Sequence, residues 1–168
     1  MNRLLKFSGL ILFAILFQAC GLYSFTGADT GEAESFQVNF FQNNADLVEP
    51  GIDRTFTLSL QDLILNQTSL NLTDVNGDLI FEGEITDFYI SPMSATAQNT
   101  AAQNRLTISV NVRYYNTLEP EKDFERRFSF YYDYPAQTQL VGGALETALD
   151  EIYTRITQDV FNAALTDW

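Results

Sequence analysis

Two segments of the sequence alternate between apolar and polar residues, and they constrain the fold more than any other feature. In residues 105–115 the even-numbered positions are apolar, and in residues 124–134 most even-numbered positions are aromatic. A period of two is typical of a β-strand with one buried face. Because both segments place apolar side chains at even positions, they can pair as a hairpin with one shared inner face. Arg126 is the exception on that face, near the hairpin end, where its long side chain can reach water.

Further strands are expected before this hairpin. Residues 35–41 alternate, with Phe36, Val38 and Phe40 on one face, and predict a first strand with that face buried.

The middle of the chain predicts a short extended piece over residues 69–73 and a long strand over residues 78–90. Gly83 suggests a bulge within the long strand, and Pro92 is expected to stop it. Residues 91–104 are small and polar, and predict a long loop. A loop of this length is either functional or a mobile hairpin tip, and the sequence supports both interpretations equally.

A first helix is expected over residues 53–66, with Asp53 as its N-cap. Phe56, Leu58 and Leu60 also fit a strand, which is the alternative interpretation. The helical interpretation rests on apolar residues that recur at helical spacing: Ile52, Phe56, Leu60, Leu63 and Ile64.

A second helix is expected from Gly142 and Gly143 to Trp168, with a core-facing apolar stripe. The predicted fold is therefore α+β: a twisted antiparallel or mixed sheet of about four to five strands, with both helices packed on one face. The stripe is formed by Leu145, Leu149, Ile152, Ile156, Val160, Ala164 and Leu165, and the opposite side by Glu146, Asp150, Glu151, Thr154, Thr157 and Gln158.

The N-terminus has the features of a bacterial lipoprotein signal peptide. A basic start and a short apolar run precede Leu16-Phe17-Gln18-Ala19-Cys20, which resembles a lipobox. The apolar run is about half the roughly 20 residues that span a bilayer, which disfavours a transmembrane anchor. Residues 1–19 are therefore interpreted as a signal peptide, Cys20 as the lipidated residue, 20–35 as a tether and 36–168 as a single domain.

Composition excludes several classes of function. Arg3 and Lys6 would leave with the signal peptide, so seven basic residues remain against 22 acidic ones, a formal charge of about −15. Such a surface repels nucleic acid. The chain has no histidine, which removes the commonest general base and metal ligand. No cofactor or metal site is expected, and no enzymatic activity.

Several segments together resemble the LptE family of lipopolysaccharide-assembly lipoproteins, in its Bacteroidota form. They are Cys20–Gly27, Phe81–Asp87, Arg105–Val110, Asp159–Ala164 and the terminal Trp168. The resemblance implies a non-enzymatic lipoprotein on the periplasmic side of the outer membrane. It implies that the domain plugs a large β-barrel translocon protein, assists assembly of that barrel and can bind lipopolysaccharide. Strand faces rich in Ser, Thr, Asn and Tyr suit the polar lumen of a barrel.

Five basic residues fall within a short stretch that the hairpin would bring together. Phosphates and acidic sugars of lipopolysaccharide are suitable partners for such a group, because arginine pairs with phosphate oxygens in a fork. The alternative is ordinary ion pairing with Glu119, Glu121, Asp123 and Glu125. The group, with Arg113 and Arg127 expected on the outer face of the hairpin, consists of Arg105, Arg113, Lys122, Arg126 and Arg127.

Acidic residues suggest two weaker alternatives. Glu82 and Glu84 share a strand face, with Asp87 expected on the other, and a carboxylate pair could serve a glycosidase. A solvated strand face is the commoner reason for such residues. The segment from Asp74 to Asp78 has the first spacings of a calcium loop but lacks its final Glu, so a turn is the better interpretation.

A lipid-anchored scaffold for another envelope complex is the alternative function.

Overall fold

The computed structural model describes residues 28–47, 49–93 and 102–166. The predicted signal peptide, Cys20 and residues 20–27 lie outside these ranges. In chain order the elements are β1 (Ser35–Val38), β2 (Gln42–Asn43), α2 (Ile52–Gln67), β3 (Asn71–Leu72), β4 (Leu79–Met93), β5 (Gln103–Asn116), the 3-10 helix η2 (Pro120–Lys122), β6 (Phe124–Pro135) and α3 (Gly143–Leu165).

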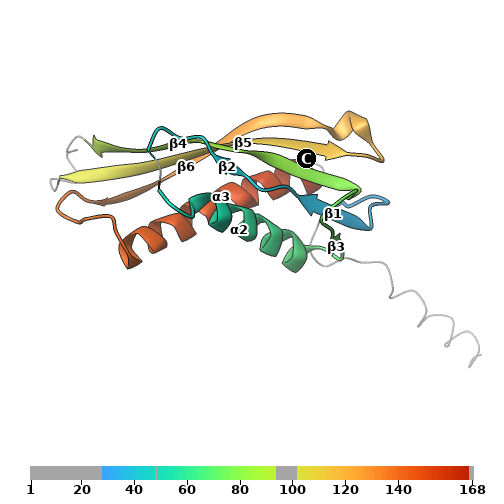
Figure 1. Cartoon of the computed structure of the whole chain (residues 1–168), viewed down its shortest axis with the longest axis horizontal. Coiled ribbons are helices and arrows are strands. Elements are labelled where there is room, and N and C mark those ends of the chain that lie inside the picture. Colours follow the sequence, from blue (N-terminus) through green and yellow to red (C-terminus); the bar gives the residue numbers. More distant parts are fainter. Residues whose placement is uncertain (1–27, 48, 94–101, 167–168) are drawn as a thin grey trace, which may run out of the picture.

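The predicted α+β architecture is confirmed. The strands form one mixed sheet in the order β3-β1-β4-β5-β6, with β2 beside β4. Both helices lie against the same face of this sheet (Figure 1). The predicted hairpin is the antiparallel pair β5–β6, in which even-numbered residues face each other, as in Leu106 opposite Tyr132. No helix in the described ranges is long and apolar enough to span a membrane.

A β-bulge lies in β4 at Thr86, three residues beyond the predicted position at Gly83. The register of β4 against β5 shifts by one residue there. Because side chains alternate along a strand, the extra residue reverses the faces of all later positions. The prediction that Asp87 faces away from Glu82 and Glu84 is therefore wrong: all three carboxylates lie on the same side of the sheet.

A second irregularity separates β1 from β2. The segment that joins β1 to β2 contains one more residue than the stretch of β4 that lies opposite it. The alternation predicted for residues 35–41 is thus wrong after Val38: Phe41 is fully buried and Phe40 is 56% exposed. The Phe41 ring packs against Gly83, where an added Cβ would lie only 2.7 Å from the ring.

The turn predicted around Asn76 and Gly77 carries the chain over β1. β3 and β4 both pair with β1 in parallel, on opposite sides of it. Asn76 has a φ of 55°, and a Cβ on Gly77 would lie 2.8 Å from the backbone nitrogen of Gln37. Asp78 closes the crossing by accepting hydrogen bonds from the backbone N–H and the hydroxyl of Ser35, at 3.0 and 2.8 Å. These bonds lower the pKa of the Asp78 carboxyl.

β4 does not stop at Pro92, contrary to the prediction. It continues to Met93 and remains paired with β5, which begins at Gln103. Within the described ranges, nothing pairs with the other side of β4 beyond its contact with β2. A proline is tolerated on such an edge because no neighbouring strand needs its N–H. The predicted loop over 91–104 is thus shorter at both ends, and residues 94–101 lie outside the described ranges.

Helix α2 confirms the helical interpretation of its segment. Leu58 is 45% exposed, as the helical stripe requires and the alternative strand does not. Asp53 is not the N-cap: that position belongs to Gly51, which has a φ of 86° and caps the helix without a side-chain bond. Asp53 lies in the first turn, where its carboxylate accepts a hydrogen bond from the N–H of Arg54 at 2.8 Å. A carboxylate there still favours the helix through its dipole.

Helix α3 confirms the predicted C-terminal helix, although it ends at Leu165 rather than Trp168. Thr157, predicted on the polar side, is buried and donates a hydrogen bond to the carbonyl of Tyr153 at 2.7 Å. Tyr153 joins α3 to α2. Its hydroxyl donates to the carbonyl of Ile52 at 3.1 Å, and its ring meets Phe56 edge to face at 5.3 Å. The apolar stripe of α3 is therefore wider than the stripe predicted from the sequence, because α3 packs against both the sheet and α2.

Candidate functional site

The face of β4, β5 and β6 that is turned away from the helices, here called the outer face, is polar across all three strands. Because the helices cover the opposite side, this face is not needed for the core (Figure 1). Hydrogen bonds join its side chains from strand to strand. The bonded residues are Glu82, Glu84, Asp87, Arg105, Ser109, Asn111, Arg113, Glu125, Arg127, Ser129 and Asp133.

Arg113 links β5 to two carboxylates of β4. Its Nε donates to Glu82 Oε1 at 3.2 Å and its Nη1 to Glu84 Oε2 at 3.0 Å. Asn111 donates to Glu84 at 3.1 Å and to Glu125 of β6 at 2.7 Å, so the network crosses all three strands. The hydrogen bonds that Arg113 donates to Glu82 and Glu84 raise the pKa of its guanidinium above the ordinary value.

Arg127 makes the corresponding link from β6. Its guanidinium forms an ion pair with Asp87 across β5 and donates to the Ser109 hydroxyl at 3.1 Å. Ser109 in turn donates to Ser129 at 3.0 Å. The bulge at Thr86 makes this ion pair possible because it turns Asp87 to the outer face.

Arg105 lies at the far end of the hairpin. It forms a two-point ion pair with Asp133, at 2.7 and 2.8 Å. Its guanidinium also lies 3.5 Å from the centre of the Tyr131 ring. The hydrogen bonds from Arg105 lower the pKa of the Asp133 carboxyl.

The five predicted basic residues therefore do not form one cluster. Arg105, Arg113 and Arg127 are spread along the outer face. Arg105 and Arg113 pair with carboxylates on the adjacent strands, and Arg127 pairs with Asp87 two strands away. Lys122 lies in η2, 3.1 Å from Glu119. Arg126 lies on the helix side, as its even position predicts.

The ion-pair partners were only partly predicted. Of the four acids proposed from sequence proximity, Glu119 pairs with Lys122, whereas the arginines of the outer face pair with acids on other strands of the sheet. Strand register was the signal that could have identified Asp133, because it lies directly opposite Arg105. The partner of Arg127 depends on the bulge at Thr86, a position that no sequence pattern indicated.

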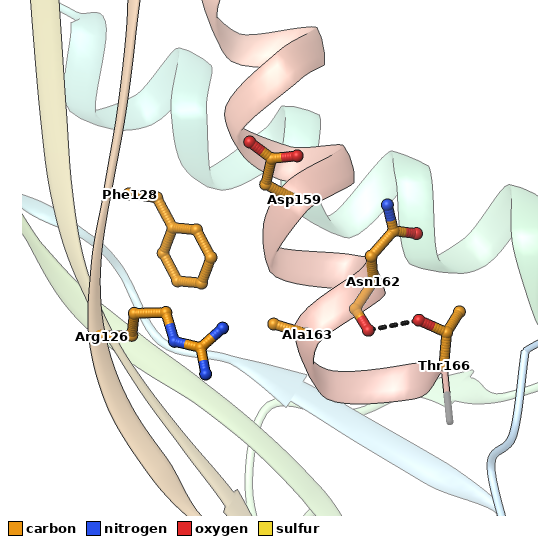
Figure 2. Close-up of a pocket in the computed structure, with 6 residues that line it drawn as sticks. All are labelled: Arg126, Phe128, Asp159, Asn162, Ala163 and Thr166. Carbon is orange, nitrogen blue, oxygen red and sulfur yellow. Dashed lines mark hydrogen bonds between the residues drawn. The ribbon is translucent and has the colours of Figure 1, made fainter. Parts of the chain in front are cut away.

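Arg126 lines a pocket of about 550 Å³ between β6 and the last turns of α3. Figure 2 shows Arg126 and Phe128 extending from β6 toward the helix, with Asp159 one turn before Ala163. The guanidinium lies 5.5 Å from the centre of the Phe124 ring and 6.0 Å from that of Phe128. Asn162 and Thr166 complete the lining, and the Thr166 hydroxyl donates to the carbonyl of Asn162.

The carboxylates of the outer face are poorly arranged for hydrolysis. A glycosidase needs one carboxyl that stays protonated beside one that is ionised. Here Glu82 and Glu84 pair with the same guanidinium, that of Arg113, so the two carboxylates share one partner and do not flank an open site. In the described ranges, no group of three or more metal-binding side chains gathers at one place.

The fold and the polar outer face define a small α+β domain whose core, among the described residues, lies between its sheet and its two helices. Solved structures with this fold include the following two. An uncharacterised lipoprotein B from Nitrosomonas europaea has 13% identity and a TM-score of 0.52, covering 84% of this chain and 86% of its own. The hypothetical protein CT253 from Chlamydia trachomatis has 8% identity and a TM-score of 0.53, covering 77% and 97%.

The sequence identifies the family. The LptE family model, described as lipopolysaccharide-assembly, matches residues 33–164. The chain therefore belongs to the LptE family, a family of non-enzymatic outer-membrane lipoproteins that work in lipopolysaccharide assembly. Among curated proteins, no sequence matches the chain significantly.

Proposed function

We propose that this protein is the lipid-anchored plug of a lipopolysaccharide translocon, and that its outer face meets the lumen wall of a large β-barrel partner. Cys20 carries the lipid and holds the domain on the periplasmic side of the outer membrane. The protein also assists assembly of the barrel. The observation that carries this proposal is the polar, strand-to-strand network of the outer face, on the side of the sheet opposite the helices.

The chemistry of the outer face supports this role. The lumen of a large outer-membrane barrel is polar, so its wall presents hydrogen-bonding side chains rather than apolar ones. Tyr89 and Tyr115 stand on the outer face with 49% and 39% exposure, and tyrosine is enriched in protein interfaces because its ring is apolar and its hydroxyl polar. Paired rather than isolated charges lower the cost of removing this surface from water.

Affinity purification tests the barrel partner. The tagged full-length protein is isolated from gently solubilised outer membranes, and its partners are identified by mass spectrometry. A stoichiometric large β-barrel protein is expected. Recovery of the protein alone, or with unrelated periplasmic proteins, would instead support a scaffold for another envelope complex.

We propose further that the basic residues contact anionic groups of lipopolysaccharide, with Arg113 and Arg127 as the main contacts on the outer face. Their ion pairs are partly exposed, and an exposed pair contributes only about 0 to 1 kcal/mol. A phosphate can therefore replace a carboxylate partner at small cost. Arg105 extends this row toward the far end of the hairpin, and Lys122 offers a further positive charge in η2, beside the end of α3.

Lipopolysaccharide binding tests these contacts. Replacing both residues, as Arg113→Ser with Arg127→Ser, should weaken binding by the folded protein at least tenfold, because charge-assisted bonds to phosphate are lost. Arg54→Ser on α2 is the matched control and should leave affinity unchanged. Equal affinity of the double variant and the wild type would exclude these two residues from the site.

A further inference from the structure

The pocket between β6 and α3 contains two opposite charges that do not pair with each other. Arg126 and Asp159 both line it. In the part of the chain that the structure describes, neither residue takes part in an ion pair within 4.0 Å. Two unpaired charges of opposite sign on the walls of one pocket are complementary to a ligand that carries both signs.

The remaining lining suits a small amphiphilic ligand. Phe128 and Ala163 supply apolar surface, and Asn162 and Thr166 supply polar atoms. The guanidinium of Arg126 can take phosphate oxygens in a fork. Thr166 follows directly on the C-terminal end of α3, where the helix dipole adds negative potential and favours a cation.

The position of the pocket indicates where such a ligand would come from. A smaller pocket, lined by Asp29 and Lys122, shares Ala163 and Thr166 with it. The N–H of Asp29 donates to the carbonyl of Leu165 at 2.7 Å, so the N-terminal segment meets the domain at this end of α3. Asp29 lies nine positions after Cys20, a stretch of chain that reaches at most about 30 Å. With Cys20 lipidated, this end of α3 stays within that distance of the membrane surface.

From these observations we propose that the pocket binds the phosphoethanolamine headgroup of a membrane phospholipid. The phosphate pairs with Arg126, and the ammonium lies between Asp159 and the carbonyl end of α3. A purely anionic headgroup would meet Asp159, and the chain's excess of acidic residues would repel it. This site is separate from the outer face and goes beyond the proposed role in the translocon. It rests on the proposed lipidation of Cys20 only for its nearness to the membrane.

Calorimetric titration of the full-length protein in nonionic detergent tests the site. The probes are dihexanoyl phosphatidylethanolamine and dihexanoyl phosphatidylglycerol, which share a phosphate but differ in the ammonium. The ethanolamine lipid is expected to bind at least tenfold more tightly. Arg126→Ala should weaken its binding at least tenfold, and Asp159→Asn should remove the preference between the two lipids.

The controls separate this proposal from the others. Arg54→Ala removes an exposed positive charge from α2 and should change the affinity less than twofold. Arg126 and Asp159 are exposed, so both variants should melt at the wild-type temperature by circular dichroism. Equal affinity for the two lipids, or unchanged binding in both pocket variants, would overturn the headgroup site. Neither result would affect purification of the barrel partner, which should still accompany Arg126→Ala.

Discussion

β5 leaves no room for a side chain at Gly83 of β4, which makes the stability of the sheet sensitive to one methyl group. A Cβ built there would lie 2.0 Å from the carbonyl oxygen of Asn111 and 2.7 Å from the Phe41 ring. A Cβ in ordinary van der Waals contact lies 3.4 Å or more from the neighbouring heavy atom, so one strand must move by more than 1 Å. Because the obstacle is backbone, Gly83→Ala should reach at least the upper end of the usual overpacking cost, about 3 kcal/mol.

Thermal unfolding followed by circular dichroism measures this effect. For a domain of this size, about 3 kcal/mol corresponds to a fall in melting temperature of roughly 10 °C. Gly143→Ala is the matched control, because a Cβ there meets nothing within 4 Å and alanine favours a helix. The control should melt at or slightly above the wild-type temperature. If Gly83→Ala melted within about 2 °C of the wild type, the strand approach inferred here would be wrong.

Two further predictions concern the bonds that hold the helices and the crossing over β1. Tyr153→Phe should lower the free energy of unfolding in urea by about 1 kcal/mol, because the buried carbonyl of Ile52 loses its donor. Tyr115→Phe on the outer face should cost less than about 0.5 kcal/mol, and equal losses would contradict the assigned bond. Because the pKa of Asp78 is lowered in the folded protein, its carboxylate stabilises the fold at pH values above the ordinary Asp pKa of about 3.9. This stabilisation is lost as the pH falls through the lowered pKa. In Asp78→Asn, the urea midpoint should therefore fall less steeply below about pH 4 than in the wild type. If the midpoint fell equally with pH in both proteins, Asp78 would not contribute to this pH dependence.

The regular parts of the fold were predictable because their signals are local and repeated. The hairpin β5–β6 followed from the shared alternation of its strands, and the helical stripe of α3 was recognised from Leu145 onward. The errors occur where a single residue changes the period. One extra residue at Thr86 turned Asp87 to the outer face, and another between β1 and β2 exchanged the roles of Phe40 and Phe41. Such insertions depend on how strands meet in space, which a pattern along the chain does not record.

The candidate sites show the same limit. Sequence proximity grouped five basic residues, but pairing across strands separates Arg126 from the arginines of the outer face. Its pocket needs Asp159, which lies 33 positions later in the chain, and only the packing of α3 against β6 brings the two together. The structure shows ion pairs of the outer arginines with acids of β4 and the end of β6, and binding of lipopolysaccharide stays a prediction.

The central claim is that the outer face meets the wall of a β-barrel, and site-specific photocrosslinking in living cells tests it most directly. A benzophenone amino acid replaces Tyr89 or Tyr115 on the outer face, and Glu151 or Thr154 on the exposed side of α3. The account predicts strong crosslinks from the two tyrosine positions to one large outer-membrane barrel protein, and weak or absent crosslinks from α3. Crosslinks from the α3 positions alone would contradict it, because the helices, not the sheet, would then face the barrel.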